Sequence, residues 1–374
     1  MKKFVYFFVS ALLMVSCNQE EVLVETPEEN AEVPRAIGFE TFVDKSSRAE
    51  GTNSTALNDY YPTFHVNGWK VVGGTPTQIF QNMAVNFVGD DKVYAEYYAA
   101  EWGKDYAPGW YYHNLRYWDK MASEYQFCAY APVAAQGVVE CSQNGQIVIG
   151  TPEAPITVET KNLKAEPAKE LSFTGFEYDY MIATSSKALD KVSLNFKHLQ
   201  AKLNIRLHLN ESVTTAQPVT VTKVIVHNLG NKGHYNNHTT EALAVSGWLL
   251  AAGDTDYTVE VIEDYGLNGT SNYNDHYVVE QLILPQTIQK AESAAPSLAK
   301  FTEACIYVEY TIGDEVFKSF TPLANIFSTS ADTTYNLEGG KQYTVNIIVG
   351  PSPIEFTANV AAWADAVETD KEMN

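Results

Sequence analysis

The sequence predicts an all-β protein with two tandem antiparallel β-sandwich domains. Short runs in which apolar and polar residues alternate recur about every 8 to 20 residues, and this period of two is typical of half-buried strands. Turn-forming Gly, Asn and Pro residues separate the runs, whereas the longer period of a helix is scarce. One sandwich holds about 100 residues, so a chain of 374 residues has room for two.

Composition places the chain among folded proteins and excludes two classes of partner. Apolar residues make up 45% of the sequence and aromatic residues 12%, which is enough to bury sizeable cores. Asp and Glu outnumber Lys and Arg by 46 to 25, which gives a formal net charge of −21. This charge repels the phosphates of nucleic acids and the headgroups of anionic lipids, so we expect neither as a partner.

Residues 1–16 have the pattern of an export signal. Lys2 and Lys3 precede an apolar stretch over residues 4–15, and the small residue Ser16 stands directly before Cys17. A stretch of about 12 apolar residues is too short for a membrane-spanning helix, which needs about 20. We therefore expect a signal peptide that is cleaved between Ser16 and Cys17, and a mature chain without a membrane span.

The end of this signal, Met-Val-Ser-Cys at residues 14–17, resembles the lipobox of bacterial lipoproteins. The resemblance implies lipidation of Cys17, whose thiol and amino group carry acyl chains such as palmitate. Each buried methylene of such a chain contributes about 0.8 kcal/mol of membrane affinity. Asn18, the next residue, resembles a signal for sorting away from the inner membrane, which implies an anchor in the outer membrane.

An acidic tether and a first strand follow the lipidation site. Residues 18–35 are acidic, contain Pro and lack aromatic residues, as is typical of a solvated linker. The next segment alternates and predicts a strand over residues 36–45, which ends in a polar stretch around Arg48. The residues expected on the buried side of this strand are Ile37, Phe39, Thr41 and Val43.

Two further local features are predicted between residues 63 and 207. Asn67-Gly68, inside the apolar run of residues 63–72, predicts a hairpin turn. In residues 191–207 the apolar residues have even sequence numbers up to Phe196 and odd sequence numbers after it. A strand with one buried face cannot change parity without an extra residue, so we expect a bulge or break at residues 198–201.

The domain boundary is predicted at the polar stretch over residues 184–191. It divides the mature chain into an N-terminal sandwich over residues 49–188 and a C-terminal sandwich over residues 189–374. Two alternating sets lie near the end of the second sandwich, on either side of a Gly-Pro-Ser-Pro segment. The first set is Tyr343, Val345, Ile347 and Val349, and the second is Ile354, Phe356, Ala358 and Val360.

The cysteines and the known catalytic motifs give no sign of an enzyme, a metal site or a cofactor. Cys128, Cys141 and Cys305 lack the C-x-x-C spacing of zinc sites and form no disulfide framework. Buried free thiols are therefore expected, in preference to a Cys128–Cys141 bond across a hairpin. Dinucleotide, P-loop, zincin and serine-hydrolase motifs do not occur in the sequence, so we predict a protein that is not an enzyme.

Several segments, in order along nearly the whole chain, resemble the fimbrillin family, the lipoprotein pilins or type V pilins of Bacteroidales-like bacteria. Besides the lipobox, the segments that carry the resemblance are YQFCAYAP at residues 125–132, DYMIATS at 179–185, VSLNFKHLQAKLNIRL at 192–207, LILPQ at 282–286 and GKQYTVNIIV at 340–349, followed by a strand with Trp363. The resemblance implies transthyretin-like sandwiches and a precursor anchored in the outer membrane.

The resemblance also implies maturation by an arginine-specific protease. The matching bond is Arg48–Ala49, which removes residues 17–48 together with the first strand. Arg35 is a rival position, but a cut there leaves the first strand in place. The strand lost by cleavage then contains Ile37, Phe39 and Val43, and its site is open to a neighbouring subunit.

Assembly follows in this reading, because a strand from residues 343–363 of another subunit fills the open site. The candidate donor row is Ile354, Phe356, Ala358 and Val360, although the strand with Tyr343, Val345, Ile347 and Val349, or the pair, is also a possible donor. Without the resemblance, both rows are consistent with ordinary C-terminal core strands. The expected partners are other fimbrial subunits, the maturation protease, the outer membrane and a host or bacterial surface ligand. The expected location is first the outer membrane and then a cell-surface fimbria.

The main alternative is a surface lipoprotein that does not polymerise and that binds a glycan or a protein. It rests on a cluster of aromatic residues, which stack on sugars when they are exposed. The cluster consists of Trp102, Trp110, Tyr111, Tyr112, Tyr117 and Trp118. A tip or anchor subunit, with its first strand or its last strands kept in place, is a further variant.

Overall fold

A computed structural model of the chain describes residues 35–43, 57, 61–89, 98, 101–102, 108–131, 139–157, 181–186, 191–209, 219–251, 265–267, 277–291, 303–328, 331–349 and 354–362. The chain divides into two units, Met1–Arg35 and Ala36–Asn374. The fold described below is that of the second unit. No helix among these residues is long and apolar enough to cross a membrane.

The described elements are almost all strands, which confirms the predicted all-β class. The strands are β1 (Gly38–Val43), β2 (Thr63–Val72), β3 (Thr75–Val88), β4 (Gly109–Tyr111), β5 (Glu124–Ala131), β6 (Val139–Cys141), β7 (Ile147–Ile149), β8 (Ile156–Thr157), β9 (Met181–Ser186), β10 (Lys191–His198), β11 (Ala201–Leu209), β12 (Val219–His227), β13 (Lys232–Asn236), β14 (Trp248–Leu250), β15 (Tyr265–Leu267), β16 (Tyr277–Ile283), β17 (Gln286–Gln289), β18 (Cys305–Ile312), β19 (Glu315–Pro322), β20 (Thr334–Leu337), β21 (Lys341–Val349) and β22 (Glu355–Ala362). The short helix α3 (Leu323–Phe327) follows β19.

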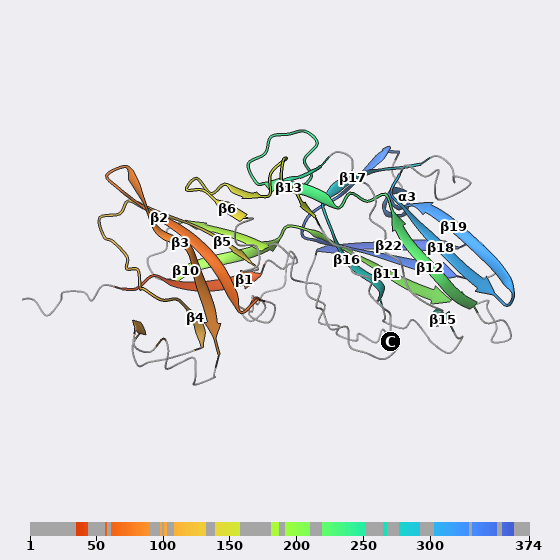
Figure 1. Cartoon of the computed structure of the whole chain (residues 1–374), viewed down its shortest axis with the longest axis horizontal. Helices are drawn as coiled ribbons and strands as arrows, with labels where there is room; N and C mark the ends of the chain where they lie inside the picture. The colour runs from red at the N-terminus through yellow and green to blue at the C-terminus, as the bar shows by residue number, and fades with distance from the viewer. Residues whose placement is uncertain are drawn as a thin grey trace, which may run out of the picture. The chain divides into compact units, whose positions relative to one another are not determined.

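The first strands form a closed barrel in the order β1-β10-β9-β5-β2-β3-β4 (Figure 1). Alternate residues of these strands point inward, as in β10, where Val192, Leu194 and Phe196 are fully buried. Together with inward residues of β1, β2, β3 and β5 they form one apolar cluster that is rich in phenylalanine. The barrel is therefore closed around an aromatic core.

Two four-stranded sheets form the second part of the fold, in the orders β16-β11-β21-β22 and β15-β12-β18-β19. Inward residues of β11 and β21 from one sheet, and of β12 and β18 from the other, belong to a single buried cluster. A shared core between two sheets is the arrangement of a β-sandwich. The strand β22 lies at the edge of its sheet, next to β21 (Figure 1).

Two of the described strand pairs are parallel, β1 with β10 and β11 with β21, although the sequence predicts antiparallel sandwiches. Each parallel pair joins strands that are far apart in the sequence, because parallel neighbours need a long crossover connection. Hairpins join the antiparallel pairs β2–β3, β18–β19 and β21–β22. The alternation of side chains is the same in both kinds of pair, so it carries no information on strand direction.

The chain leaves the barrel at Leu199 and Gln200. The strand β10 pairs with β1 and β9 in the barrel, whereas β11 pairs with β16 and β21 in the sandwich. This confirms the break predicted at residues 198–201, and we propose it as the boundary between the two domains. A further sheet joins β6, β7 and β8, from before this point, to β13 and β14, from after it.

The hairpin predicted at Asn67-Gly68 is wrong, because β2 runs straight through both residues. The turn lies instead at Gly73 and Gly74, which have φ angles of +58° and +79°. At Gly68 a Cβ atom would lie only 2.9 Å from ring carbons of Phe80 and Phe127. This glycine therefore makes room for two core rings and does not form a turn.

A disulfide joins Cys128 on β5 to Cys141 on β6, with the two Cα atoms 6.2 Å apart. The expectation of free thiols at these two positions is therefore wrong. Cys128 lies on the side of β5 that faces away from the barrel interior, where it meets the sheet that contains β6. Cys305 is free and buried, and burial raises the pKa of its thiol to about 12. It is therefore protonated at neutral pH.

A buried polar network lies on the outer side of β2. His65 Nδ1 is 3.0 Å from the Tyr130 hydroxyl, which donates a hydrogen bond to Asn82 Oδ1. Asn67 Nδ2 donates to the same oxygen, and Asn67 Oδ1 accepts from the backbone N–H of Asn82. The imidazole is 3% exposed, and burial lowers the pKa of His65. The neutral form of this histidine is therefore the one that fits the fold.

The disulfide predicts a measurable loss of stability on reduction. Closing a loop of this length stabilises a fold by about 3 kcal/mol in the chain-entropy view. We expect dithiothreitol to lower the free energy of unfolding of the wild type by about this amount, measured by urea denaturation. The double variant Cys128→Ala/Cys141→Ala serves as the control, since dithiothreitol should leave its stability unchanged. Equal midpoints for the reduced and oxidised wild type would contradict the disulfide.

The buried His65 predicts a loss of stability at mildly acidic pH. The unfolded chain binds a proton near pH 6.5, whereas the folded chain does so only at lower pH. The stabilising contribution is therefore complete above about pH 6.5 and is lost as the pH falls toward the folded pKa. We expect the unfolding free energy between pH 7 and 5 to fall less steeply in His65→Gln. The exposed His238 offers the control, because His238→Gln should keep the slope of the wild type.

Candidate functional site

The first strand, β1, closes the barrel between β10 and β4. It pairs in parallel with β10 at six positions, from Gly38 opposite Lys191 to Val43 opposite Phe196. It pairs with β4 at Phe39 opposite Trp110, and the backbone N–H of Ile37 donates a 2.7 Å hydrogen bond to the carbonyl oxygen of Arg116. Without β1, backbone groups of β10 and of the β4 side would lose their partners.

The inner side of β1 is buried as deeply as any part of the core. Ile37, Phe39 and Thr41 are 0%, 3% and 0% exposed. The Phe39 ring lies edge-on to four other rings, at centroid distances between 5.5 and 6.1 Å. These four rings, which we call the Phe39 pocket, belong to Phe64, Phe80, Tyr112 and Phe127. Each such contact contributes about 0.5–1.5 kcal/mol beyond the area that it buries.

Tyr112 also holds the start of β1 through its hydroxyl group. Its Oη donates a 2.8 Å hydrogen bond to the carbonyl oxygen of Ile37 and accepts one of 3.3 Å from the backbone N–H of Arg116. Trp102 Nε1 donates to the carbonyl oxygen of Tyr112 and fixes the segment after β4. Burial raises the pKa of Tyr112, so the hydroxyl keeps its proton and remains a donor.

Two polar residues of β1 have contrasting surroundings. Glu40 faces outward, and its Oε1 accepts a hydrogen bond from Ser193 Oγ on β10. The Thr41 hydroxyl points inward and has no hydrogen-bond partner among the described residues, although it is fully buried. A buried hydroxyl without a partner costs free energy, because it has lost its hydrogen bonds to water. Thr41 is therefore the one poor fit in an otherwise apolar row.

The candidate donor strand, β22, is much less buried than β1. Among the described strands it pairs only with β21, in an antiparallel ladder, and lies at the edge of the sheet. Ile354 and Phe356 pack partly against the sandwich core, whereas Ala358 is exposed and Val360 is 37% exposed. In contrast, β21 pairs on both sides, and the inward residues Tyr343, Val345, Ile347 and Val349 are completely buried.

Some of the predicted site residues lie outside the described part of the chain. These are Ser16 and Cys17, at the predicted signal-peptide cleavage and lipidation site, and Arg48 and Ala49, at the predicted maturation site. The side chain of Val43 is also outside it, although the backbone of Val43 is placed opposite Phe196. The predictions for these positions therefore remain predictions.

The aromatic cluster that motivates a glycan-binding alternative is largely internal. Trp110 and Tyr112 are buried, and Trp102, Tyr111 and Trp118 are half-buried. Trp118 packs edge-on against Tyr125 and Phe127. Tyr117 is 49% exposed and is the most accessible member. These rings serve mainly to pack the barrel around β1.

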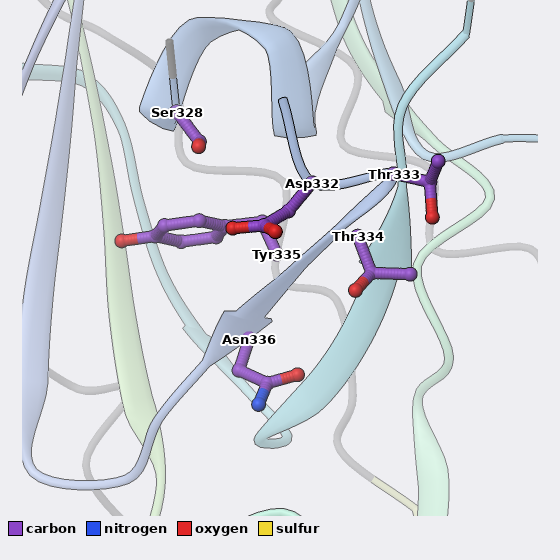
Figure 2. Close-up of a pocket in the computed structure, with 6 residues that line it drawn as sticks. All are labelled: Ser328, Asp332, Thr333, Thr334, Tyr335 and Asn336. Carbon is purple, nitrogen blue, oxygen red and sulfur yellow. The ribbon is translucent and has the colours of Figure 1, made fainter. Parts of the chain in front are cut away.

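A shallow pocket of about 460 Å³ lies at the start of β20. Figure 2 shows the six residues that line it, Ser328, Asp332, Thr333, Thr334, Tyr335 and Asn336. Asp332 is the only carboxylate among them. No group of three or more potential metal ligands occurs in the described residues. The pocket therefore offers neither a pair of carboxylates nor a nucleophile with its base.

Sequence reasoning missed Tyr112, Phe80 and Phe127 as parts of the site. Tyr112 lies 75 residues after Ile37, to which it donates its hydrogen bond, and no local pattern reveals such a contact. Its position in an aromatic segment predicted core packing, with a sugar-binding surface as the alternative, but gave no contact with the first strand. The glycine of Asn67-Gly68 was an available signal for two of these residues, because a residue without a Cβ atom lets the rings of Phe80 and Phe127 approach the backbone closely.

Comparison with known proteins identifies the family. The family model described as fimbrillin-like matches residues 73–363. A fimbrial protein from Bacteroides vulgatus has a similar structure, with a TM-score of 0.52 and 14% identity over 88% of this chain and 100% of that one. The tip fimbrial protein Mfa3 from Porphyromonas gingivalis aligns with a TM-score of 0.41 and 10% identity, over 81% of this chain and 94% of that one.

At these identities the structural likeness concerns the fold alone. A search of curated proteins gave no match. The family match, by contrast, covers well over half of the sequence. The family match agrees with the two predictions that the protein is a structural protein of the cell surface and that it is not an enzyme. The chain therefore belongs to the fimbrillin-like family, a family of fimbrial proteins of the cell surface.

Proposed function

We propose that this protein is a fimbrial subunit that assembles by strand exchange after cleavage behind β1. The observation that carries the proposal is the position of β1, which is buried in the barrel and ends at Val43, a few residues before Arg48. Residues 44–62 connect β1 to β2 along the chain. A cut after Arg48 therefore leaves β1 held by noncovalent contacts alone, chiefly its backbone ladder, the Phe39 pocket and the hydrogen bond from Tyr112.

Loss of β1 leaves a defect that a strand of another molecule can repair. The defect has unpaired backbone groups on β10 and an exposed Phe39 pocket, and both are unfavourable in water. An extended segment with alternating apolar residues restores the ladder and refills the pocket, which is β-augmentation. A strand from residues 343–363 is the proposed donor. Because the donor strand and the site are built from different strands and sheets of the chain, the contact is heterologous and continues into a filament.

The earlier steps of the proposed pathway take the precursor to the cell surface. The signal over residues 1–16 directs export, and acyl chains on Cys17 hold the precursor in the outer membrane. The Cys128–Cys141 disulfide agrees with export, because such bonds persist in oxidising compartments. An arginine-specific protease then cuts between Arg48 and Ala49, and the assembled fimbria adheres to a host or bacterial surface.

Cleavage of the purified precursor tests this proposal directly. We expect an arginine-specific protease to yield a chain that begins at Ala49 and forms ladders resistant to sodium dodecyl sulfate, because each filled site restores a full strand of hydrogen bonds. Arg48→Lys should remain monomeric under the same treatment. The matched control Arg35→Lys should assemble like the wild type. A chain cut at Arg48 that stays monomeric would refute strand exchange.

The Phe39 pocket predicts how firmly the precursor retains β1. Replacing a buried phenylalanine by alanine typically costs about 3–5 kcal/mol. We expect Phe39→Ala to lower the free energy of unfolding of the uncut precursor by about this amount, measured by urea denaturation. Phe42→Ala removes the same side chain from an outward, half-buried position of β1 and should cost clearly less. Equal losses for the two variants would contradict the importance of the pocket.

A further inference from the structure

The two strands that strand exchange would interchange carry nearly the same alternating row of residues in the sequence. In β1 and the residue before it, the row is Ile37, Phe39, Thr41 and Val43. In β22 and the residue before it, the row is Ile354, Phe356, Ala358 and Val360. The spacing is identical, and only the third position differs. The row of β21, which begins Tyr343 and Val345, has no phenylalanine at its second position.

The same kind of row is buried to different extents in its two places. In β1, Phe39 is 3% exposed and touches four rings. In β22, Phe356 is only half-buried, and Val360 is 37% exposed. Moving the β22 row into the site of β1 therefore buries more apolar surface than the edge of its own sheet does. The Phe39 pocket surrounds a phenylalanine ring, and Phe356, the second residue of the β22 row, supplies the same ring.

The third position explains how the incoming strand can fit better than the strand that it replaces. Thr41 puts a fully buried hydroxyl with no described hydrogen-bond partner into the core. Ala358 has no polar side-chain atom, so it removes this penalty while leaving a small side chain at the same point. In β22, Ala358 is exposed, so nothing in the sandwich core requires an alanine there.

We propose that the donor strand enters the site in one register, with Ile354, Phe356, Ala358 and Val360 at the positions of Ile37, Phe39, Thr41 and Val43, and that the change from Thr41 to Ala358 favours the exchange. This inference rests on the proposed function and adds its residue-level specificity. In this register Thr357 takes the place of Glu40 opposite Ser193. The hydroxyl of Thr357 can then accept the hydrogen bond that Ser193 donates to Glu40.

The occupant is the β22 of a second copy. Within one chain, residues 350–354 join β21 to β22, and five residues span at most about 18 Å. The strand β21 is fixed in the sandwich by its buried row and its two neighbours. The strands β1 and β22 also belong to different sheets, built on different core clusters (Figure 1). These constraints favour donation to another molecule.

A cysteine cross-link tests the register. Neighbouring residues of paired strands have Cα atoms about 5 Å apart, within the range of a disulfide, whereas diagonal positions lie about 8 Å apart and are too distant. The full-length chain with Ser193→Cys/Thr357→Cys is cut with the arginine-specific protease, which also removes Cys17, and is then oxidised. Peptide mapping by mass spectrometry should find an intermolecular 193–357 disulfide. Ser193→Cys/Asn359→Cys is the off-register control, and the uncut precursor should give no cross-link.

The possible results separate the register from assembly itself. A dominant 193–357 bond in the ladder supports the register. A ladder without this bond, or with a dominant 193–359 bond, overturns the register and leaves strand exchange standing. A cut chain that forms no ladder overturns both. The existing Cys128–Cys141 bond and the buried Cys305 do not compete for the new thiols.

The role of the third position is tested by assembly rates. We expect Ala358→Thr to slow assembly of the cut chain by at least about fivefold, because the donor then carries the hydroxyl that Thr41 carries now. Ala361→Thr changes another exposed alanine of β22, which does not belong to the row of Ile354, Phe356, Ala358 and Val360. This variant should assemble at the rate of the wild type. Equal rates for Ala358→Thr and the wild type, followed by light scattering at equal protein concentration, would overturn this role.

Discussion

The contact between Phe39 and the four rings around it is the interaction on which the described structure depends most. One side chain of β1 meets rings from β2, β3, β5 and the segment after β4. The same strand closes the barrel between β10 and β4. The first strand is thus part of the core, yet it precedes all other strands in the sequence. A single cut in the backbone behind it therefore separates it covalently from the rest of the fold.

Much of the fold follows from local patterns in the sequence. The alternation of Ile37, Phe39 and Thr41 predicts β1 and its buried side, and the parity change after Phe196 predicts the break between β10 and β11. Both depend on the period of two in a strand, which any half-buried sheet imposes. The same period occurs in parallel and antiparallel strands and gives no information on the direction of a neighbouring strand. The parallel pairing of β1 with β10 was therefore not predictable.

The features that the sequence did not reveal all depend on contacts between distant segments. The disulfide requires β6 to lie on the outer side of β5, and this placement follows from the pairing of β7 with β13, almost ninety residues later. Tyr112 acts on the first strand through its hydrogen bond to Ile37 and through its ring contact with Phe39. The glycine in Asn67-Gly68 is needed for packing and not for a turn. Local propensity cannot distinguish these roles, because each is decided by the partner.

The parallel ladder between β1 and β10 has a consequence for any assembly built on this site. An incoming strand that repeats the inward row of β1 must run in the same direction along β10, since reversal would exchange the places of its large and small residues. Every copy is then added in one orientation. A fibre of such copies is polar, with an empty acceptor site at one end and an unused donor strand at the other. Its two ends therefore differ chemically. Proteins that cap the fibre and proteins that anchor it need different binding surfaces.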